Sequence, residues 1–271
     1  MAEENAEEEN RIHKSSTEIK EAYFIFGRFQ PPHFGHAHLI NTLYDMAKEK
    51  GADPYVFPTS TTEPPDRNPL SIDRKIVYLK KMFPPSRYPL LRIINTTAKE
   101  CTIIYDVIKL LKEAGYEKLT LFVGPDRVES FAKQFAVPKF VEEFGTVDIV
   151  AEKRLDIEPE ITGISAAASA SPPDKISATI VRKYVKNENR SSFAKATKIG
   201  TMTNDNVNAM MLNVQAGLTR SKQKKEKKEK KEKCSASAAA VPNNMEGGTR
   251  KRTRKYRNVP SRRRRHRRRV Y

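Results

Sequence analysis

Two histidines three residues apart, His33 and His36, end a stretch whose residue types suit the binding of an anion. The stretch, residues 27–36, reads Gly-Arg-Phe-Gln-Pro-Pro-His-Phe-Gly-His. The apolar run 23–26 before it predicts a buried strand, and apolar residues at helical spacing after it predict a helix that ends at Gly51. We therefore expect the histidines on a strand-to-helix turn, where free N–H groups of a helix N-terminus favour a phosphate.

Two further segments have the character of a turn that leads into a helix. Residues 124–127, Gly-Pro-Asp-Arg, follow a strongly apolar run, and Asp126 is expected to cap the next helix. Residues 176–182, Ile-Ser-Ala-Thr-Ile-Val-Arg, place two hydroxyls at a helix start and an arginine one turn later. In a parallel sheet these turns would converge with the histidine turn at one edge. Together they offer the donors that a nucleoside triphosphate needs.

Strand and helix patterns alternate along the part of the chain that must position these turns. A polar, proline-rich loop at 59–69 is expected to cover the site. Near-continuous apolar strands that alternate with helices predict an α/β, Rossmann-like doubly wound parallel five-stranded sheet with C-terminal helices. The strands are expected at 23–26, 54–58, 90–94, 119–123 and 147–151, and the helices after the histidines, at 71–82, 102–114, from Asp126, and at 178–185, 191–197 and 205–216.

Charge is concentrated at the end of the chain. The sequence has 51 Lys and Arg against 33 Asp and Glu, and 22 of the former and 4 of the latter lie from Arg220 onward, so 29 of each remain before it. We predict an acidic disordered arm at 1–20, one folded domain at 21–217, and a disordered Lys/Glu spacer, linker and Arg-rich tail at 218–271. The Arg-rich tail at 250–269 indicates binding of nucleic acid or another polyanion, or a nuclear-localisation signal. The alternative is a solvated basic extension without such a function.

Cysteine usage and hydropathy bear on location. The two cysteines, Cys101 and Cys234, cannot form a disulfide framework, which favours a reducing compartment. The acidic N-terminus does not resemble a secretory signal, and no apolar run is long enough to span a membrane. We expect an intracellular protein, cytoplasmic or nuclear, with no membrane association.

The two strongest motifs resemble those of the nucleotidyltransferase superfamily whose signatures are His-x-Gly-His and Ile-Ser-x-Thr-x-x-Arg. Both are complete here, at 33–36 and 176–182, and the resemblance covers residues 22–217. It extends to cytidylyltransferase-like and nicotinamide-nucleotide adenylyltransferase-like proteins. Asn-Pro-Leu-Ser at 68–71 and Gly-x-Asp-Arg at 124–127 look closest to the branch found in large phages and other DNA viruses.

The resemblance implies transfer of a nucleoside monophosphate from a nucleoside triphosphate to a small phosphorylated acceptor, with release of pyrophosphate. It implies catalytic roles for His33 and His36 near the reacting α-phosphorus and for Arg182 on the leaving pyrophosphate. A magnesium ion bound to the nucleotide is expected, without a metal site of the protein's own. The residues implied in nucleotide binding are Gly27, Arg28, Phe29, Gln30, Gly35, Gly124, Asp126, Ser177 and Thr179.

Two alternatives stay open, one for the identity of the donor nucleotide and one for whether the chain is an enzyme. Cytidylyl transfer is commonly associated with an Arg-Thr-x-Gly lead-in before Ile-Ser-x-Thr, but Ser-Pro-Pro-Asp-Lys stands at 171–175, so ATP is slightly preferred over CTP. Absence of Trp weakens aromatic recognition of a nicotinamide acceptor. The rival hypothesis is a nucleic-acid-binding or particle-associated protein that retains the fold without the activity.

Several single residues also have a structural interpretation. His33 and His36 could belong to the helix start alone, or could bind zinc with His38, which otherwise is expected in solvent. Asp126 could be a plain helix cap rather than a ribose contact. Cys101 is expected to be a buried or half-buried thiol. The lysines expected on the solvent side of the 71–82 helix are Lys75, Lys80 and Lys81.

Overall fold

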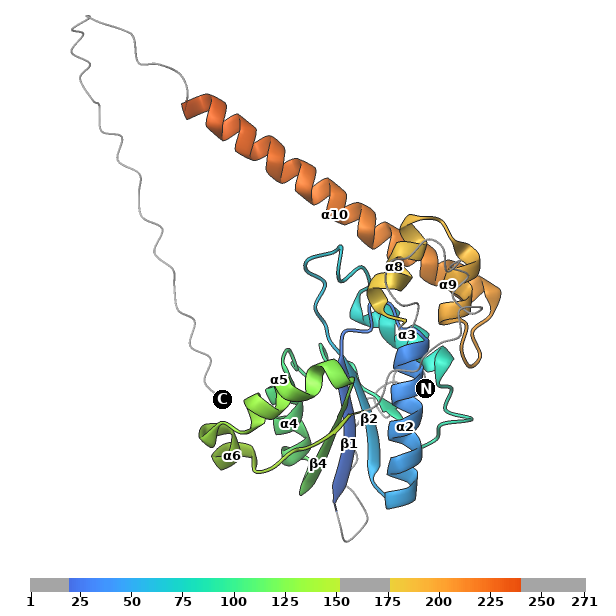
Figure 1. Ribbon diagram of the computed structural model, residues 1–271, viewed down its shortest axis with the longest axis vertical. Coiled ribbons are helices and arrows are strands. Elements are labelled where there is room, and N and C mark those ends of the chain that lie inside the picture. The colour runs from blue at the N-terminus through green and yellow to red at the C-terminus, as the bar shows by residue number, and fades with distance from the viewer. Residues whose placement is uncertain (1–19, 152–175, 240–271) are drawn as a thin grey trace, which may run out of the picture. The chain divides into compact units, whose positions relative to one another are not determined.

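The computed structural model describes residues 20–151 and 176–239, which belong to two units, 1–227 and 228–271. Five parallel strands form one sheet in the order β3-β2-β1-β4-β5. Figure 1 shows β1 between β2 and β4. The order reverses at β1, so the carboxyl ends of β1 and β4 flank a topological switch point, where ligands bind in such sheets. The predicted Rossmann-like fold is confirmed. The strands are β1 (Glu21–Gly27), β2 (Asp53–Pro58), β3 (Arg92–Ile93), β4 (Lys118–Val123) and β5 (Asp148–Ala151).

Side chains of β1 alternate between two hydrophobic cores, one on each face of the sheet. Tyr23 and Ile25 pack into one core, and Ala22 and Phe24 pack into the core on the opposite face. Each core is covered by its own set of helices, the first set over Tyr23 and Ile25 and the second over Ala22 and Phe24. Burial on both faces explains the near-continuous apolar strands. The first set is α2 (Phe34–Lys50), α3 (Ile72–Met82), α8 (Ala178–Lys186), α9 (Arg190–Thr197) and the start of α10 (Asn204–Ala239); the second is α4 (Ile104–Glu113), α5 (Pro125–Phe135) and α6 (Pro138–Phe144).

Several element boundaries differ from the predictions. The strand expected at 90–94 has two residues, and the helix expected at 205–216 continues as α10 to Ala239. The Lys/Glu run that follows residue 216 consists of good helix formers, so it prolongs the helix instead of ending it. Helix α6, which begins with Pro138 at its first position, was not predicted. The predicted arm at 1–20, apart from its last residue, and the part of the predicted 218–271 extension from residue 240 onward lie outside the described residues.

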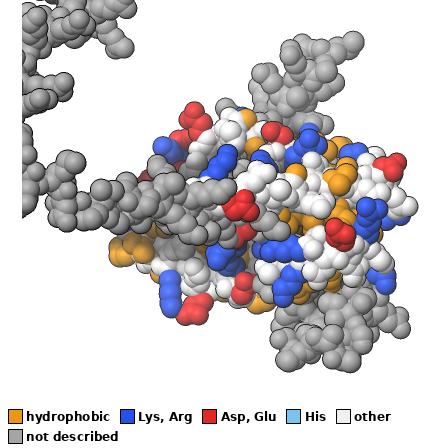
Figure 2. All heavy atoms as spheres, turned by 90° about the horizontal axis from the view of Figure 1, so that it is seen from above, with side chains coloured by type: hydrophobic (Ala, Val, Ile, Leu, Met, Phe, Trp, Pro, Cys, Tyr) orange, Lys and Arg blue, Asp and Glu red, His pale blue; other side chains and the backbone are white. Residues whose placement is uncertain are grey.

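Acidic and basic side chains are interspersed over the face drawn in Figure 2. This mixture agrees with the equal numbers of both signs before Arg220. Among the described residues, no helix is both long enough and apolar enough to cross a membrane. Cys101 is buried as predicted, and burial raises the pKa of its thiol to about 11, with a smaller contribution from Asp106.

One prediction for α3 is wrong. Lys75, expected on the solvent side, is fully buried, and its Nζ donates a hydrogen bond to the carbonyl oxygen of Thr59 at 2.5 Å. Lys80 and Lys81 are half-buried, and Lys81 donates to the Oδ1 of Asn206 on α10 at 2.9 Å. The prediction failed because the β2–α3 loop and α10 cover a helix face that is polar in sequence.

Candidate functional site

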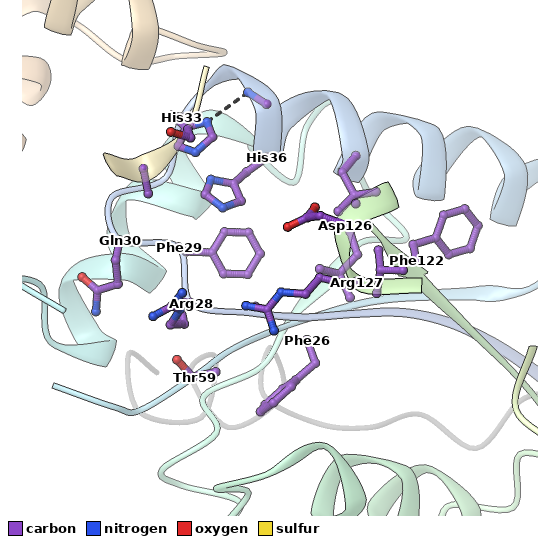
Figure 3. A pocket seen from close by; sticks show the side chains of 18 of the residues that line it. Phe26, Arg28, Phe29, Gln30, His33, His36, Thr59, Phe122, Asp126 and Arg127 are labelled. Carbon is purple, nitrogen blue, oxygen red and sulfur yellow. Dashed lines mark hydrogen bonds between the residues drawn. The ribbon is translucent and has the colours of Figure 1, made fainter. Parts of the chain in front are cut away.

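The turn between β1 and α2 is held by contacts among its own rings. Phe29 has a positive φ of 49°, and its buried ring lies 4.7 Å from that of His36, centroid to centroid. The rings of His33 and His36 are 3.9 Å apart (Figure 3). The two predicted catalytic histidines therefore form one packed cluster at the start of α2.

His33 is the N-cap residue of α2, and its Nδ1 accepts a hydrogen bond from the backbone N–H of Gly35 at 3.1 Å. An imidazole that accepts at Nδ1 carries its proton on Nε2 when neutral, so the cap selects the tautomer that donates from Nε2. A Cβ at Gly35 would lie 3.1 Å from His33 Cε1 and 3.4 Å from the carbonyl oxygen of Ile176. The glycine therefore lets the ring and the 176–182 segment approach the helix start together.

Helix α8 is anchored to the β1–α2 turn through an arginine. Arg182 donates from Nη1 to the carbonyl oxygen of Gln30 at 2.7 Å and from Nη2 to Thr179 Oγ1 at 3.1 Å. Ser177 caps α8 by accepting from the N–H of Ile180 at 3.4 Å. Burial and the positive charge of Arg28 lower the pKa of Arg182, so this guanidinium is partly desolvated and would gain from an anionic neighbour.

The turn after β4 differs from the prediction in its cap. Gly124 is the N-cap residue of α5 and Pro125 is the first helical residue, so Asp126 lies within the first turn and is not the cap. Proline suits that first position because its N–H would have no helical partner there. A Cβ at Gly124 would lie 2.9 Å from Asp126 Oδ1, so the glycine allows the carboxylate to fold back over the turn.

A single cavity of about 790 Å³ is lined by all of the residues that the sequence analysis assigned to the site. It lies at the carboxyl ends of β1 and β4, and Figure 3 shows His36, Phe29, Arg28, Asp126 and Arg127 around it. The predicted residues that line it are Gly27, Arg28, Phe29, Gln30, His33, Gly35, His36, Gly124, Asp126, Ser177, Thr179 and Arg182.

Other lining residues were not assigned to the site from the sequence. The β2–α3 loop, predicted to cover the site, contributes Thr59, Thr61 and Arg67. Thr102 and Ile103 line the cavity from the start of α4, and Ile103 remains half exposed. The rule that ligands bind where parallel strands end could have drawn attention to these segments, because each lies between the end of a strand and the start of a helix.

Two pocket residues have surroundings that the sequence did not indicate. His38, expected in solvent, is half-buried and lines the cavity. Gln30 is almost fully buried, and its amide makes two hydrogen bonds of 2.8 Å with the backbone of Leu70, one as donor and one as acceptor. The side chain of Gln30 thus fixes the β2–α3 loop to the β1–α2 turn, and its backbone carbonyl holds Arg182.

Metal-ligand side chains do not gather in the described part of the chain: residues 20–151 and 176–239 contain no group of three or more His, Cys, Asp or Glu that could hold an ion. The pocket's carboxylate is that of Asp126, at the start of α5. A cation that enters this pocket would therefore take most of its ligands from another molecule.

Comparison with known families gives one match. A family model described as cytidylyltransferase-like matches residues 24–184, which run from β1 to α8 and include the three turns that line the cavity. A search of curated proteins found none that matches the chain.

Proposed function

The chain belongs to the cytidylyltransferase-like family and so has the fold of a nucleotidyltransferase; on this premise we propose that it transfers a nucleoside monophosphate from a nucleoside triphosphate to a small phosphorylated acceptor. The observation that carries the proposal is the convergence of residues 27–36, 124–127 and 176–182 on one cavity at the switch point of the sheet. The narrower resemblance to proteins of large phages and DNA viruses stays a prediction.

In the proposed reaction an oxygen of the acceptor phosphate attacks the α-phosphorus of the nucleotide in line with the bond to the β-phosphate. A new P–O bond forms, the bond between the α-phosphorus and the bridging oxygen breaks, and pyrophosphate leaves with the electron pair. No protein nucleophile takes part, so the residues contribute position and charge.

Two of the three turns contact the phosphates in this proposal. His33 donates from Nε2 to the α-phosphate, and His36 beside it stabilises the charge that builds up on the same oxygens. Ser177 and Thr179, at the start of α8, donate to the β- and γ-phosphates. Arg182 neutralises the departing pyrophosphate with its planar set of donors.

We propose that magnesium arrives with the nucleotide, whose phosphate oxygens supply most of its ligands. The donor set of the cavity fits this, because Asp126 can contribute one carboxylate and the remaining ligands must come from phosphate and water. When bound, the ion screens the phosphate charges that oppose an anionic attacking group.

We propose ATP as the preferred donor over CTP, on the sequence ground that Ser-Pro-Pro-Asp-Lys at 171–175 replaces the lead-in common to cytidylyl transfer. The test is pyrophosphate release by the full chain with ATP or CTP, each with magnesium and a panel of phosphorylated acceptors. Release above that of an Arg182→Gln variant is expected with ATP and one class of acceptor. Equal background release by both proteins with every pair would refute nucleotidyl transfer, and faster release with CTP would reverse the donor preference.

A further inference from the structure

The loop between β2 and α3, residues 59–70, forms a wall of the cavity that the proposed triphosphate contacts leave unused. Thr59, Thr61 and Arg67 of this loop line the cavity. Both ends of the loop are bonded to the β1–α2 turn: the N–H of Thr59 donates to the carbonyl oxygen of Gly27 at 2.8 Å, and Leu70 is paired with the amide of Gln30. The wall is thus in place before a ligand binds, which reduces the entropic cost of binding.

Positive charge gathers on and behind this wall. Arg28 and Arg67 are exposed and line the cavity, and both lower the pKa of Arg182, while Asp66 of the same loop acts on this pKa in the opposite direction. Lys75 lies behind the wall, fully buried, and is bonded to the carbonyl oxygen of Thr59. A carbonyl oxygen stabilises a buried ammonium group less than a carboxylate would. The charged form of Lys75 is therefore unfavourable in the empty protein, and an anion in the cavity beside the wall would stabilise it.

The hydroxyl of Thr59 is a second, independent sign of a ligand. Thr59 is 8% exposed and lines the cavity, and its Oγ1 has no hydrogen-bond partner among the described residues. Buried hydroxyls in proteins almost always have a partner. Figure 3 shows Thr59 below the β1–α2 turn near Arg28, whose charge also acts on Lys75. A polar group that needs a partner therefore lies within the cluster of positive charges.

We propose that Arg28, Thr59 and Arg67 form a second anion subsite, which binds the phosphate of the acceptor, and that Lys75 is a positioning residue whose buried charge supports it. The assignment to the acceptor rests on the proposed function. The subsite uses other side chains than the triphosphate contacts proposed at His33, Ser177, Thr179 and Arg182. It assigns Arg28, which the resemblance implies in nucleotide binding, to the acceptor instead. This division explains how two polyanionic substrates can occupy one cavity, because each has its own positive charges.

Binding of sulfate tests the proposal without turnover. Sulfate, a dianion that does not titrate near neutral pH, is added to the full chain saturated with the non-hydrolysable analogue α,β-methylene-ATP, and binding is measured by calorimetry. We expect sulfate to bind beside the analogue. Lys75→Met should weaken sulfate binding about tenfold, equivalent to about 1.4 kcal/mol, and change analogue binding by less than about twofold. Arg74→Met, an exposed neighbour on the same helix, is the matched control and should change neither.

Proton uptake separates a charged from a merely structural Lys75. Burial and Arg28 lower the pKa of Lys75 to about 7, so at pH 8 the empty protein holds it mostly neutral, and an anion nearby should raise this pKa again. Sulfate binding at pH 8 should then take up protons, seen as a heat that differs between Tris and HEPES buffers. Because the cavity also contains His33, His36 and His38, the relevant quantity is the uptake that Lys75→Met removes and Arg74→Met retains.

Two results would overturn the proposal: displacement of sulfate by the analogue, which would mean a single anion site, or unchanged sulfate binding in Lys75→Met. If melting shows that Lys75→Met is unfolded, Arg67→Gln provides the same comparison from an exposed position. The subsite and the proposed function fail separately. A chain that binds sulfate as described but releases no pyrophosphate would retain the subsite and refute the transferase.

Discussion

Substitution of His33 can separate its capping of α2 from its proposed role on the α-phosphate. Asparagine is a strong N-cap residue and offers an oxygen to the N–H of Gly35 in place of His33 Nδ1, now 3.1 Å away, but it has no donor at the position of Nε2. Alanine removes both the cap and the donor. Both substitutions remove the ring that lies 3.9 Å from His36, so that loss cancels when the two variants are compared.

Stability and turnover should therefore respond differently to the two variants. The cap is worth about 1 kcal/mol, so His33→Ala should be less stable than His33→Asn by about that amount in chemical or thermal unfolding. Loss of one preorganised donor lowers turnover by about a hundredfold or more, so both variants should lose pyrophosphate release to that extent. If His33→Asn kept near wild-type turnover, His33 would be a helix cap and no catalytic residue.

Three further outcomes are expected. His36→Ala should keep the fold, measured by circular dichroism, and lower turnover about a hundredfold; unchanged turnover would contradict the mechanism. The pKa of Cys101 is raised to about 11 from an ordinary 9.0, so at pH 8 the native chain should contain about a hundredfold less Cys101 thiolate than the unfolded chain. Alkylation of Cys101 should be slower in the native chain by a similar factor, measured for each peptide by mass spectrometry. Equal rates in the native and unfolded chains would show that Cys101 is accessible. Removal of residues 240–271 should leave pyrophosphate release intact and weaken retention on heparin; loss of release would show that the tail takes part in the reaction.

The parts of the fold that could be predicted from the sequence are those that local pattern determines. Apolar runs identified all five strands. For β1, β2 and β4 the reason is that a strand buried on both faces must be apolar at nearly every position. The turn at 27–36 and the helix start at 176–182 were recognised from glycine, proline and hydroxyl residues whose preferences act over a few residues. Their convergence followed from the rule for parallel sheets and needed no knowledge of side-chain contacts.

The parts that could not be predicted depend on contacts between distant segments. Lys75 is polar on a helix with an apolar side, so its sequence favours solvent; its burial results from the loop that begins at Thr59 folding over α3. The hydrogen bonds between the Gln30 side chain and the backbone of Leu70 could not be predicted either, because the two residues are forty positions apart in the sequence. The cap of α5 is an error of a different kind, because Pro125 already marked Gly124 as the residue before the helix.

The strand order has a consequence for how the cavity comes into existence. β1, which leads into the histidine turn, precedes the other four strands of the sheet in the sequence, yet it lies at the centre. One of its two partners is the later strand β4, with Ala22 opposite Leu119. The turn then still needs Arg182, which bonds to the carbonyl of Gln30 from late in the chain. The pocket thus forms only when segments that are distant in the sequence come together, and such contacts form slowly during folding. A ligand that binds it should raise the melting temperature of the whole domain, since no smaller piece contains the site.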